Sequence, residues 1–148
     1  MNVNSFFCGA GGFDIGFVQA GFTIEQAYDF NEHAVKSYRH NFGNHVQLAD
    51  VSKMVGSDLS YADIWLYGFP CQDLTKNGKR TGINGSRSGM FFEIMRLLGE
   101  VEERPKIILA ENVRGLSKYF DIVEAEYAAK GYRLYKTLYN SKYWGVPQ

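Results

Sequence analysis

Short apolar segments alternate with longer amphipathic segments along this 148-residue chain, and this alternation constrains the fold more than any other feature. The apolar segments have the length of buried β-strands, whereas the segments between them show helical spacing of apolar residues. This order is typical of βα units, which build a parallel sheet covered by helices on both faces. The sequence therefore predicts one α/β domain over residues 1–148.

The expected elements follow from where the apolar segments begin and end. Strands are expected over Val3–Phe7, Thr23–Tyr28, Val46–Ala49, Ile64–Tyr67 and Lys106–Ala110. Helices are expected over Phe13–Ala20, Glu32–Asn41 and Met90–Val101. Four polar or reactive residues follow the carboxyl ends of predicted strands, namely Asp29, Asp50, Cys71 and Glu111. Ligands of open α/β sheets bind at that edge, so we expect a site there.

A glycine-rich turn, Gly9–Gly12, connects the first expected strand to the first expected helix. Such turns let a nucleoside or dinucleotide cofactor approach the backbone closely. Asp29 lies about 20 residues after Gly9, where an acid can bind ribose hydroxyls, and Asp50 could accept from an adenine amino group. Two alternatives are a turn that serves only helix packing and a nicotinamide-binding domain, although the Gly-x-Gly-Gly spacing disfavours the latter.

Cys71 and Glu111 supply a thiol and a carboxylate that suit addition of a nucleophile to a pyrimidine ring. Cys71 follows Gly68–Pro70, and the proline restricts the backbone just before the thiol. Glu111 follows an apolar run, and at the end of a buried strand it would be partly desolvated and able to act as a donor. The alternatives are a buried structural cysteine and a helix-capping Glu-Asn pair. Cys8 lacks comparable neighbours, so we expect it to be structural.

Residues 76–89 contain four basic residues, four glycines and no acid. A long connection of this composition is typical of a mobile loop that closes over a polyanion, or of a solvated surface loop. The net charge of zero does not indicate a dedicated nucleic-acid-binding module. Two cysteines without zinc spacing predict no metal site. No signal peptide or membrane-spanning segment is evident, so a cytoplasmic location is expected.

Taken in order, these segments resemble the catalytic domain of the DNA cytosine-5 methyltransferases. The resemblance covers nearly the whole chain and rests on Phe7–Gly12, Asp29, Asp50, Gly68–Gln72, Arg87–Gly89, Glu111–Val113 and Tyr143–Gln148. It implies a Rossmann-like sheet that uses S-adenosylmethionine as the cofactor. The residues it places around the cofactor are Phe7, Gly9, Ala10, Gly11, Gly12, Asp29, Phe30, Asp50, Val51, Gly68 and Pro70.

The resemblance also implies a catalytic role for certain residues. The target cytosine would be flipped out of double-stranded DNA, since its ring is unreachable while stacked. Cys71 would add to ring carbon-6, and Glu111 would hydrogen-bond nitrogen-3 and the amino group. Asn112 would hold the Pro70–Cys71 turn, with Gln72 as a further catalytic residue. DNA contacts are expected from Thr75, Lys76, Lys79, Arg80 and Arg87.

The chain also departs from the family pattern. Asp73 stands where a small neutral residue is usual, and the Arg-containing segment, the target-recognition region and the C-terminal helix of the family are absent. We therefore expect a sheet that is incomplete at its C-terminal end, with a gap beside a strand at Arg133–Leu138. A downstream segment or second polypeptide would supply target recognition. A tRNA cytosine-5 methyltransferase and a non-catalytic module of the same fold are the alternatives.

Overall fold

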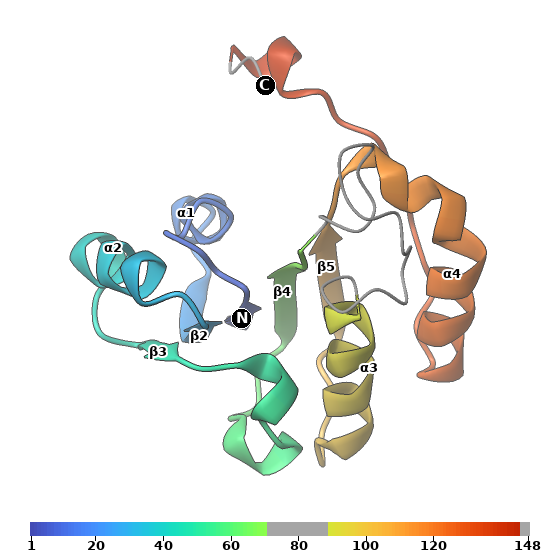
Figure 1. Ribbon diagram of the computed structural model, residues 1–148, viewed down its shortest axis with the longest axis horizontal. Helices are drawn as coiled ribbons and strands as arrows, with labels where there is room; N and C mark the ends of the chain where they lie inside the picture. The colour runs from blue at the N-terminus through green and yellow to red at the C-terminus, as the bar shows by residue number, and fades with distance from the viewer. Residues whose placement is uncertain (71–88, 146–148) are drawn as a thin grey trace.

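The computed structural model describes residues 1–70 and 89–145, which form a five-stranded parallel sheet with helices on both faces (Figure 1). The strand order is β3-β2-β1-β4-β5, so the chain starts in the middle and fills one side of the sheet before the other. This order confirms the predicted Rossmann-like α/β fold. The strands are β1 (Asn2–Phe6), β2 (Thr23–Asp29), β3 (Val46–Leu48), β4 (Ile64–Gly68) and β5 (Ile107–Glu111).

Among the described residues, α1 and α2 lie on one face of the sheet and α3 and α4 on the other (Figure 1). Short 3₁₀-helices fill several of the connections, and the sequence analysis did not anticipate them. The α-helices are α1 (Asp14–Gln19), α2 (Glu32–Phe42), α3 (Met90–Glu100) and α4 (Phe120–Ala129). The 3₁₀-helices are η1 (Val51–Lys53), η2 (Gly56–Asp58), η4 (Arg114–Tyr119) and η5 (Ser141–Trp144).

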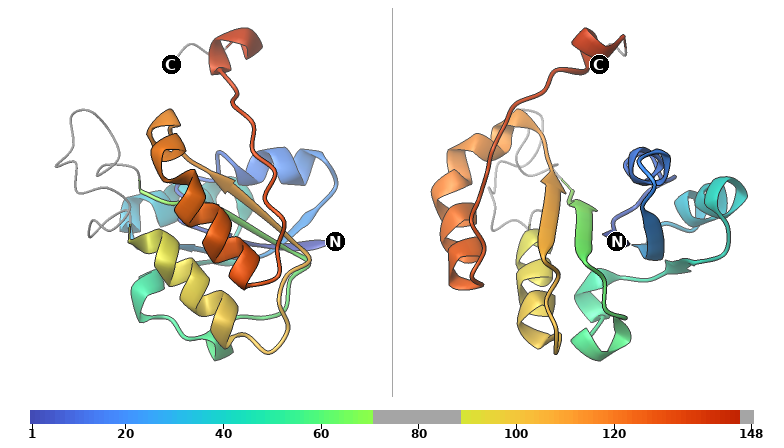
Figure 2. Two further views of the ribbon diagram at one scale, coloured as in Figure 1. Left: turned by 90° about the vertical axis from the view of Figure 1, so that its right-hand side faces the viewer. Right: turned by 180° about the vertical axis from the view of Figure 1, so that it is seen from behind.

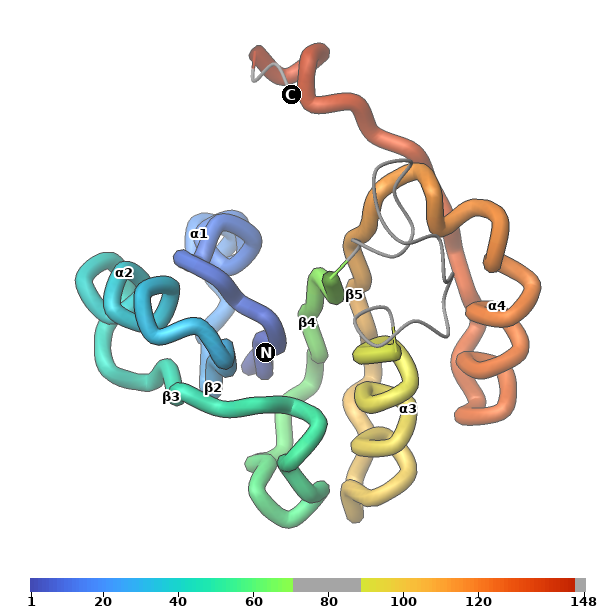
Figure 3. Tube along the Cα trace, in the orientation of Figure 1, coloured from blue at the N-terminus to red at the C-terminus, as the bar shows by residue number. Residues whose placement is uncertain are grey.

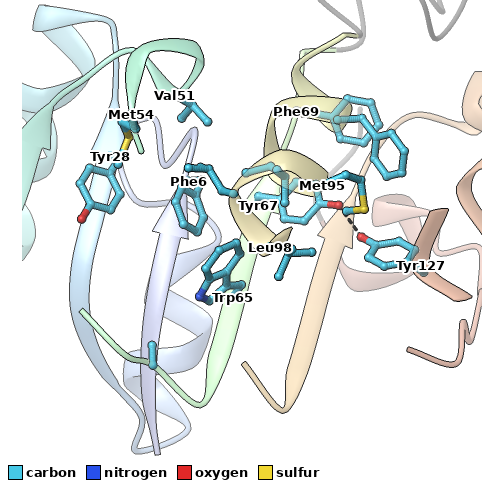
Figure 4. Close-up of a cluster of buried hydrophobic side chains, with 14 of the residues drawn as sticks. Phe6, Tyr28, Val51, Met54, Trp65, Tyr67, Phe69, Met95, Leu98 and Tyr127 are labelled. Atoms are coloured by element: carbon cyan, nitrogen blue, oxygen red, sulfur yellow. Dashed lines mark hydrogen bonds between the residues drawn. The ribbon is translucent and has the colours of Figure 1, made fainter. Parts of the chain in front are cut away.

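Alternating side chains of the central strands build a separate apolar cluster on each face. On β4, Ile64 and Leu66 belong to the cluster under α1 and α2, whereas Trp65 and Tyr67 belong to the cluster under α3 and α4. Figure 4 shows the second cluster, in which the hydroxyl groups of Tyr67 and Tyr127 point toward each other and hydrogen-bond. A central strand that is apolar on both faces is what a parallel sheet requires.

Strand β5 differs from the expectation of a buried strand. It pairs only with β4, so it is an edge strand of the described sheet, and Ile107 and Leu109 are 49% and 42% exposed. The pairing of Ile64 with Ile107 and of Leu66 with Leu109 places these two side chains on the face that carries α1 and α2. Those helices cover β1 to β4 but do not reach β5 (Figure 1). The side of β5 that carries Ile107 and Leu109 therefore lacks a cover among the described residues, whereas Ile108 packs on the other side against the cluster under α3 and α4.

The strand expected at Arg133–Leu138 is wrong, because residues 132–140 have no regular secondary structure. Tyr132 still packs near α4 and donates a hydrogen bond from its hydroxyl to the carbonyl of Pro105. Beyond this contact the chain passes the carboxyl ends of the strands and extends away from the sheet to η5 (Figures 2 and 3). A strand requires a neighbour for its backbone groups, and the described residues provide none at this place.

The glycine turn between β1 and α1 depends on the absence of side chains for two different reasons. Gly11 has a φ of +92°, and a Cβ built on it would lie 2.2 Å from the ring of Phe42. Gly11 is therefore required for the packing of the turn against α2. Gly12 has no positive φ, and a Cβ there would meet nothing within 4 Å. The missing side chain of Gly12 therefore leaves open space beside the backbone and is not needed for packing against another residue.

We expect Gly11→Ala to lower the free energy of unfolding by about 2–4 kcal/mol, because the new methyl group adds left-handed strain and overlaps Phe42. Gly12→Ala is the matched control and should change the same quantity by less than about 1 kcal/mol. Denaturant titration of both variants measures the difference. Equal losses in the two variants would contradict this account of the turn.

Candidate active site

A hollow of about 480 Å³ opens at the carboxyl ends of β1, β4 and β5. Its size is within the range of small-molecule sites. It lies where β1 and β4 are neighbours and the connections leave toward opposite sides of the sheet, which is the usual ligand position in such folds. Its lining residues are Ser5, Phe6, Phe7, Cys8, Gly12, Phe13, Gly68 and Glu111.

The backbone at the end of β1 bends sharply around this hollow. Phe7 has a φ of +53°, the only positive value of a non-glycine residue in the described chain, and Gly9 follows with +56°. Such a conformation costs a residue with a side chain about 1–2 kcal/mol. Hydrogen bonds on both sides offset this cost: Cys8 N–H donates to Tyr28 C=O at 3.1 Å, and Gly11 N–H donates to Cys8 C=O at 2.9 Å. The bend turns the backbone of residues 7–12 along the wall of the hollow.

The carboxylate of Asp29 holds the glycine turn against the end of β2. One oxygen accepts from the N–H of Gly9 at 2.9 Å, and the other accepts from the N–H of Asn31 at 2.8 Å. Asp29 is the last residue of β2 and is 7% exposed, so these two bonds form in a largely buried place. The next residue, Phe30, is an apolar side chain that is 69% exposed. An acid that orders the turn and an exposed aromatic ring thus lie side by side in sequence.

Asp50 and Val51 do not line the hollow. Asp50 caps η1, accepting hydrogen bonds from the hydroxyl and the backbone N–H of Ser52 at 2.7 and 3.1 Å. The Ser52 hydroxyl, as the main cause, lowers the pKa of Asp50. Val51 is buried in the cluster under α3. Asp50 remains partly exposed, and its carboxylate is accessible from outside the fold.

Glu111 reaches the hollow because its neighbour on β4 is a glycine. The two residues are paired in register, and a Cβ on Gly68 would lie 3.3 Å from Oε2 of Glu111. Glu111 is the last residue of β5 rather than the residue after it. Its side chain is exposed, in contrast to the desolvated carboxylate expected from the apolar run. Gly68 therefore leaves the space in which this carboxylate lies beside the end of β4.

Asn112 connects the ends of β4 and β5. Its side-chain amide donates a hydrogen bond to the carbonyl of Phe69 at 2.9 Å, and its side-chain oxygen accepts from the N–H of Val113. Phe69 immediately precedes Pro70, so this bond fixes the backbone that leads into Cys71 in the sequence. The bond contacts Phe69, one residue before the Pro70–Cys71 turn that Asn112 was expected to hold, and Cys71 lies outside the described residues, so that role stays a prediction.

A buried acid behind the glycine turn was missed by the sequence analysis. Asp14, at the start of α1, is fully buried, and its carboxylate accepts from the hydroxyls of Ser5 and Tyr38, each at 2.7 Å. Burial is the main cause that raises the pKa of Asp14, and the two hydrogen bonds act in the opposite direction. An acid among the apolar residues Phe13, Ile15 and Phe17 of a short helix was the available signal.

Cys8 is buried, as expected for a structural cysteine. Burial, with smaller contributions from the charges of Asp14 and Asp29, raises its pKa far above the ordinary thiol value. A thiol in this state is a poor nucleophile at neutral pH.

The structure brings together part of the expected site. Of the cofactor and catalytic candidates, Phe7, Gly12, Gly68 and Glu111 line the hollow, and Asp29 and Asn112 hold the segments that form it. Gly9, Ala10, Gly11, Phe30 and Pro70 lie in the adjoining turns without appearing in its lining. The remaining candidates fall outside the described residues, namely Cys71, Gln72, Thr75, Lys76, Lys79, Arg80 and Arg87.

Within residues 1–70 and 89–145, no three His, Cys, Asp or Glu side chains are arranged to hold a metal ion. The helices of the same residues are all too short or too polar to cross a membrane.

We expect Asp29→Asn to lower the free energy of unfolding by about 1–3 kcal/mol, because an amide group would meet one of the two backbone N–H donors with its own N–H. Asp50→Asn is the matched control, and since Asn caps a helix as well as Asp does, its change should stay within about 0.5 kcal/mol. Denaturant titration at pH 7 compares the two. An Asp29→Asn protein as stable as the control would show that the turn does not depend on this carboxylate.

Known proteins with similar sequences identify the family of this chain. The C-5 cytosine-specific DNA methylase family matches residues 1–148. Relatives include the type II methyltransferases M.NgoFVII of Neisseria gonorrhoeae, 34% identical over 97% of this chain and 40% of its own length, and M.FnuDI of Fusobacterium nucleatum, 35% identical over 100% and 44%. The chain thus spans less than half the length of these relatives.

Solved structures agree with the sequence comparison. An S. pombe Dnmt2 methyltransferase superposes with a TM-score of 0.83 at 26% identity, over 99% of this chain and 47% of its own. The Entamoeba histolytica methyltransferase EhMeth superposes with a TM-score of 0.81 at 22% identity, over 99% and 49%, which supports the fold alone. The family match over residues 1–148 shows that this chain belongs to the C-5 cytosine-specific DNA methylase family.

Proposed function

We propose that this chain is the cofactor-binding and catalytic part of an enzyme that transfers a methyl group from S-adenosylmethionine to carbon-5 of cytosine in DNA. The observation that carries the proposal is the shared hollow. The glycine turn, suited to a nucleoside cofactor, and the carboxylate of Glu111, suited to a pyrimidine, line the same space of about 480 Å³. A methyl donor and its acceptor must be held within reach of each other. A hollow that is lined by the glycine turn on one side and by Glu111 on another meets this requirement.

The residues around the hollow fit S-adenosylmethionine. The open space next to Gly12 admits a ligand against the backbone, and the exposed ring of Phe30 offers an apolar face to an adenine base. The carboxylate of Asp29 has lone pairs beyond the two that accept from Gly9 and Asn31, and these can accept from ribose hydroxyls. When bound, the cofactor supplies an electrophilic methyl group. The partly exposed Asp50 is proposed to accept from the adenine amino group.

Cys71 is the proposed nucleophile. Cys8, the other cysteine, is buried with a strongly raised pKa, so Cys71 is the better candidate for a thiolate. Its sulfur would form a bond to carbon-6 of the flipped cytosine, and the electron pair of the 5,6 double bond would become available at carbon-5. After carbon-5 is methylated, loss of its proton to a base and departure of the Cys71 sulfur from carbon-6 restore the aromatic ring.

Glu111 is proposed to hold the cytosine edge during this sequence. Its carboxyl group at the mouth of the hollow is proposed to take up a proton, which it would donate to nitrogen-3, and to accept from the amino group with its other oxygen. Proton donation at nitrogen-3 stabilises the negative charge that addition of the thiolate places on the ring. Asn112 acts through the bond to Phe69, which positions the backbone leading to Cys71. Gln72 is proposed as a further catalytic residue, and Thr75, Lys76, Lys79, Arg80 and Arg87 are proposed to contact the DNA.

We further propose that residues outside this sequence, on the same polypeptide or a second one, complete the enzyme and recognise the target. The face of β5 that carries Ile107 and Leu109 is exposed, whereas the equivalent face of β4 is buried under helices. Beyond α4 the exposed apolar side chains accumulate, including Tyr135, Leu138, Tyr139, Tyr143 and Trp144. An apolar set of this extent is typical of an interface. The relatives contain more than twice the length matched here.

A covalent trap tests the chemistry. Duplex DNA that contains 5-fluorocytosine should form a stable adduct with the complete enzyme in the presence of S-adenosylmethionine, because fluorine cannot leave carbon-5 as a proton would. Cys71→Ser should form no adduct, and Glu111→Gln should slow adduct formation by about 100-fold or more. Denaturing electrophoresis detects the adduct.

Cys8→Ala is the control and should still form the adduct. An equivalent tRNA that contains 5-fluorocytosine tests the alternative substrate. Adduct formation with Cys71→Ser, or with tRNA and not with DNA, would contradict the proposal.

Replacement of the exposed β5 side chains tests the completion of the enzyme. Ile107→Lys combined with Leu109→Lys should leave the chain folded, since both positions are exposed, but should weaken association with a co-expressed remainder of the enzyme by at least about tenfold. Val55→Lys is the control, because Val55 is equally exposed but lies before η2. Gel filtration and circular dichroism measure association and folding. A wild-type chain that is a stable and active monomer by itself would overturn the proposal.

A further inference from the structure

Asp14 is a buried carboxylate that the proposed chemistry does not use. It has no measurable exposure, and among the described residues no Lys or Arg forms an ion pair with it. Its two direct partners are the hydroxyls of Ser5 and Tyr38. A charge in this position is costly, since burial raises the pKa of Asp14. Such a cost at a core position calls for a reason.

The hydrogen-bond directions favour the ionised carboxylate. The Tyr38 hydroxyl donates to one carboxylate oxygen of Asp14, and it also lies 3.2 Å from a ring nitrogen of His45, which can donate to it in the tautomer protonated at that nitrogen. Ser5 donates to the other carboxylate oxygen. The hydroxyls of Tyr38 and Ser5 thus point toward Asp14 from two sides, with His45 behind Tyr38. Hydroxyl groups carry no net charge, so these hydrogen bonds stabilise an ionised carboxylate without neutralising its charge.

The carboxylate lies directly behind the wall of the hollow. Ser5, whose hydroxyl oxygen is 2.7 Å from Asp14, lines the hollow itself, and so do Gly12 and Phe13, the two residues that precede Asp14. Apolar rings of the cluster under α1 and α2, including Phe13 and Phe17, surround the same region. A charge in such surroundings is poorly screened, so its field extends into the hollow.

We propose that Asp14 sets the preference of this site for a positively charged cofactor over the uncharged product of methyl transfer. The inference rests on the proposed function, in which S-adenosylmethionine, with its sulfonium charge, becomes S-adenosylhomocysteine, whose thioether carries none. Asp14 attracts the sulfonium and gains nothing from the thioether. The loss of that attraction after transfer favours exchange of the spent product for a new cofactor.

Calorimetric titration of the two ligands against the complete enzyme, as wild type and as Asp14→Asn, at pH 8 tests the proposal. We expect the variant to lose about fivefold more affinity for S-adenosylmethionine than for S-adenosylhomocysteine, because only the first ligand carries a charge that the buried carboxylate attracts. The ratio is independent of any loss of folded protein, because both ligands bind the same folded fraction. Glu124→Gln is the control: it removes an exposed carboxylate on α4, outside the lining of the hollow, and should leave the ratio unchanged.

The outcomes separate the two proposals. An equal loss of affinity for both ligands in Asp14→Asn overturns the role of Asp14 and leaves the proposed function intact. A changed ratio in Glu124→Gln as large as that in Asp14→Asn also overturns it, because the effect would then not depend on the position of Asp14 behind the hollow. A complete wild-type enzyme that binds neither ligand overturns the cofactor assignment of the hollow together with the role of Asp14.

Discussion

The parallel pairing of β1 with β4 is the constraint on which the rest of this structure depends. The chain fills the sheet from β1 outward in one direction through β2 and β3, and then returns to place β4 on the other side. The connections therefore diverge above the ends of β1 and β4, and none of the described helices lines the hollow between them apart from the start of α1. The hollow that contains Gly12 and Glu111 exists because of this divergence.

Two carboxylates with different environments support the wall of this hollow. Asp29 accepts from backbone N–H groups and orders the turn, and Asp14 accepts from two hydroxyls behind the turn. Glu111, by contrast, is exposed and lies beside Gly68. The buried carboxylates of Asp14 and Asp29 thus support the wall of the hollow, whereas the exposed carboxylate of Glu111 is available to a substrate.

The predictable part of the fold was the order of its elements. Strands over Thr23–Tyr28 and Ile64–Tyr67 were placed within a residue of their observed bounds, because apolar runs between turn residues are a local signal. The strand expected at Arg133–Leu138 failed because a strand needs a partner, and partners are not encoded locally. For the same reason, the apolar run in β5 did not reveal that Ile107 and Leu109 would be exposed.

The sequence by itself determined the α/β class, the glycine turn and the arrival of Asp29 and Glu111 at one sheet edge, since residue type and strand period are local properties. Only the tertiary structure decided that Gly11 makes room for Phe42 and Gly68 for the Glu111 carboxylate. It also decided that Asp14 meets Ser5 and Tyr38 behind the wall. Most of these contacts join residues from different elements, and they follow from tertiary packing, which the spacing of residues in the sequence does not reveal.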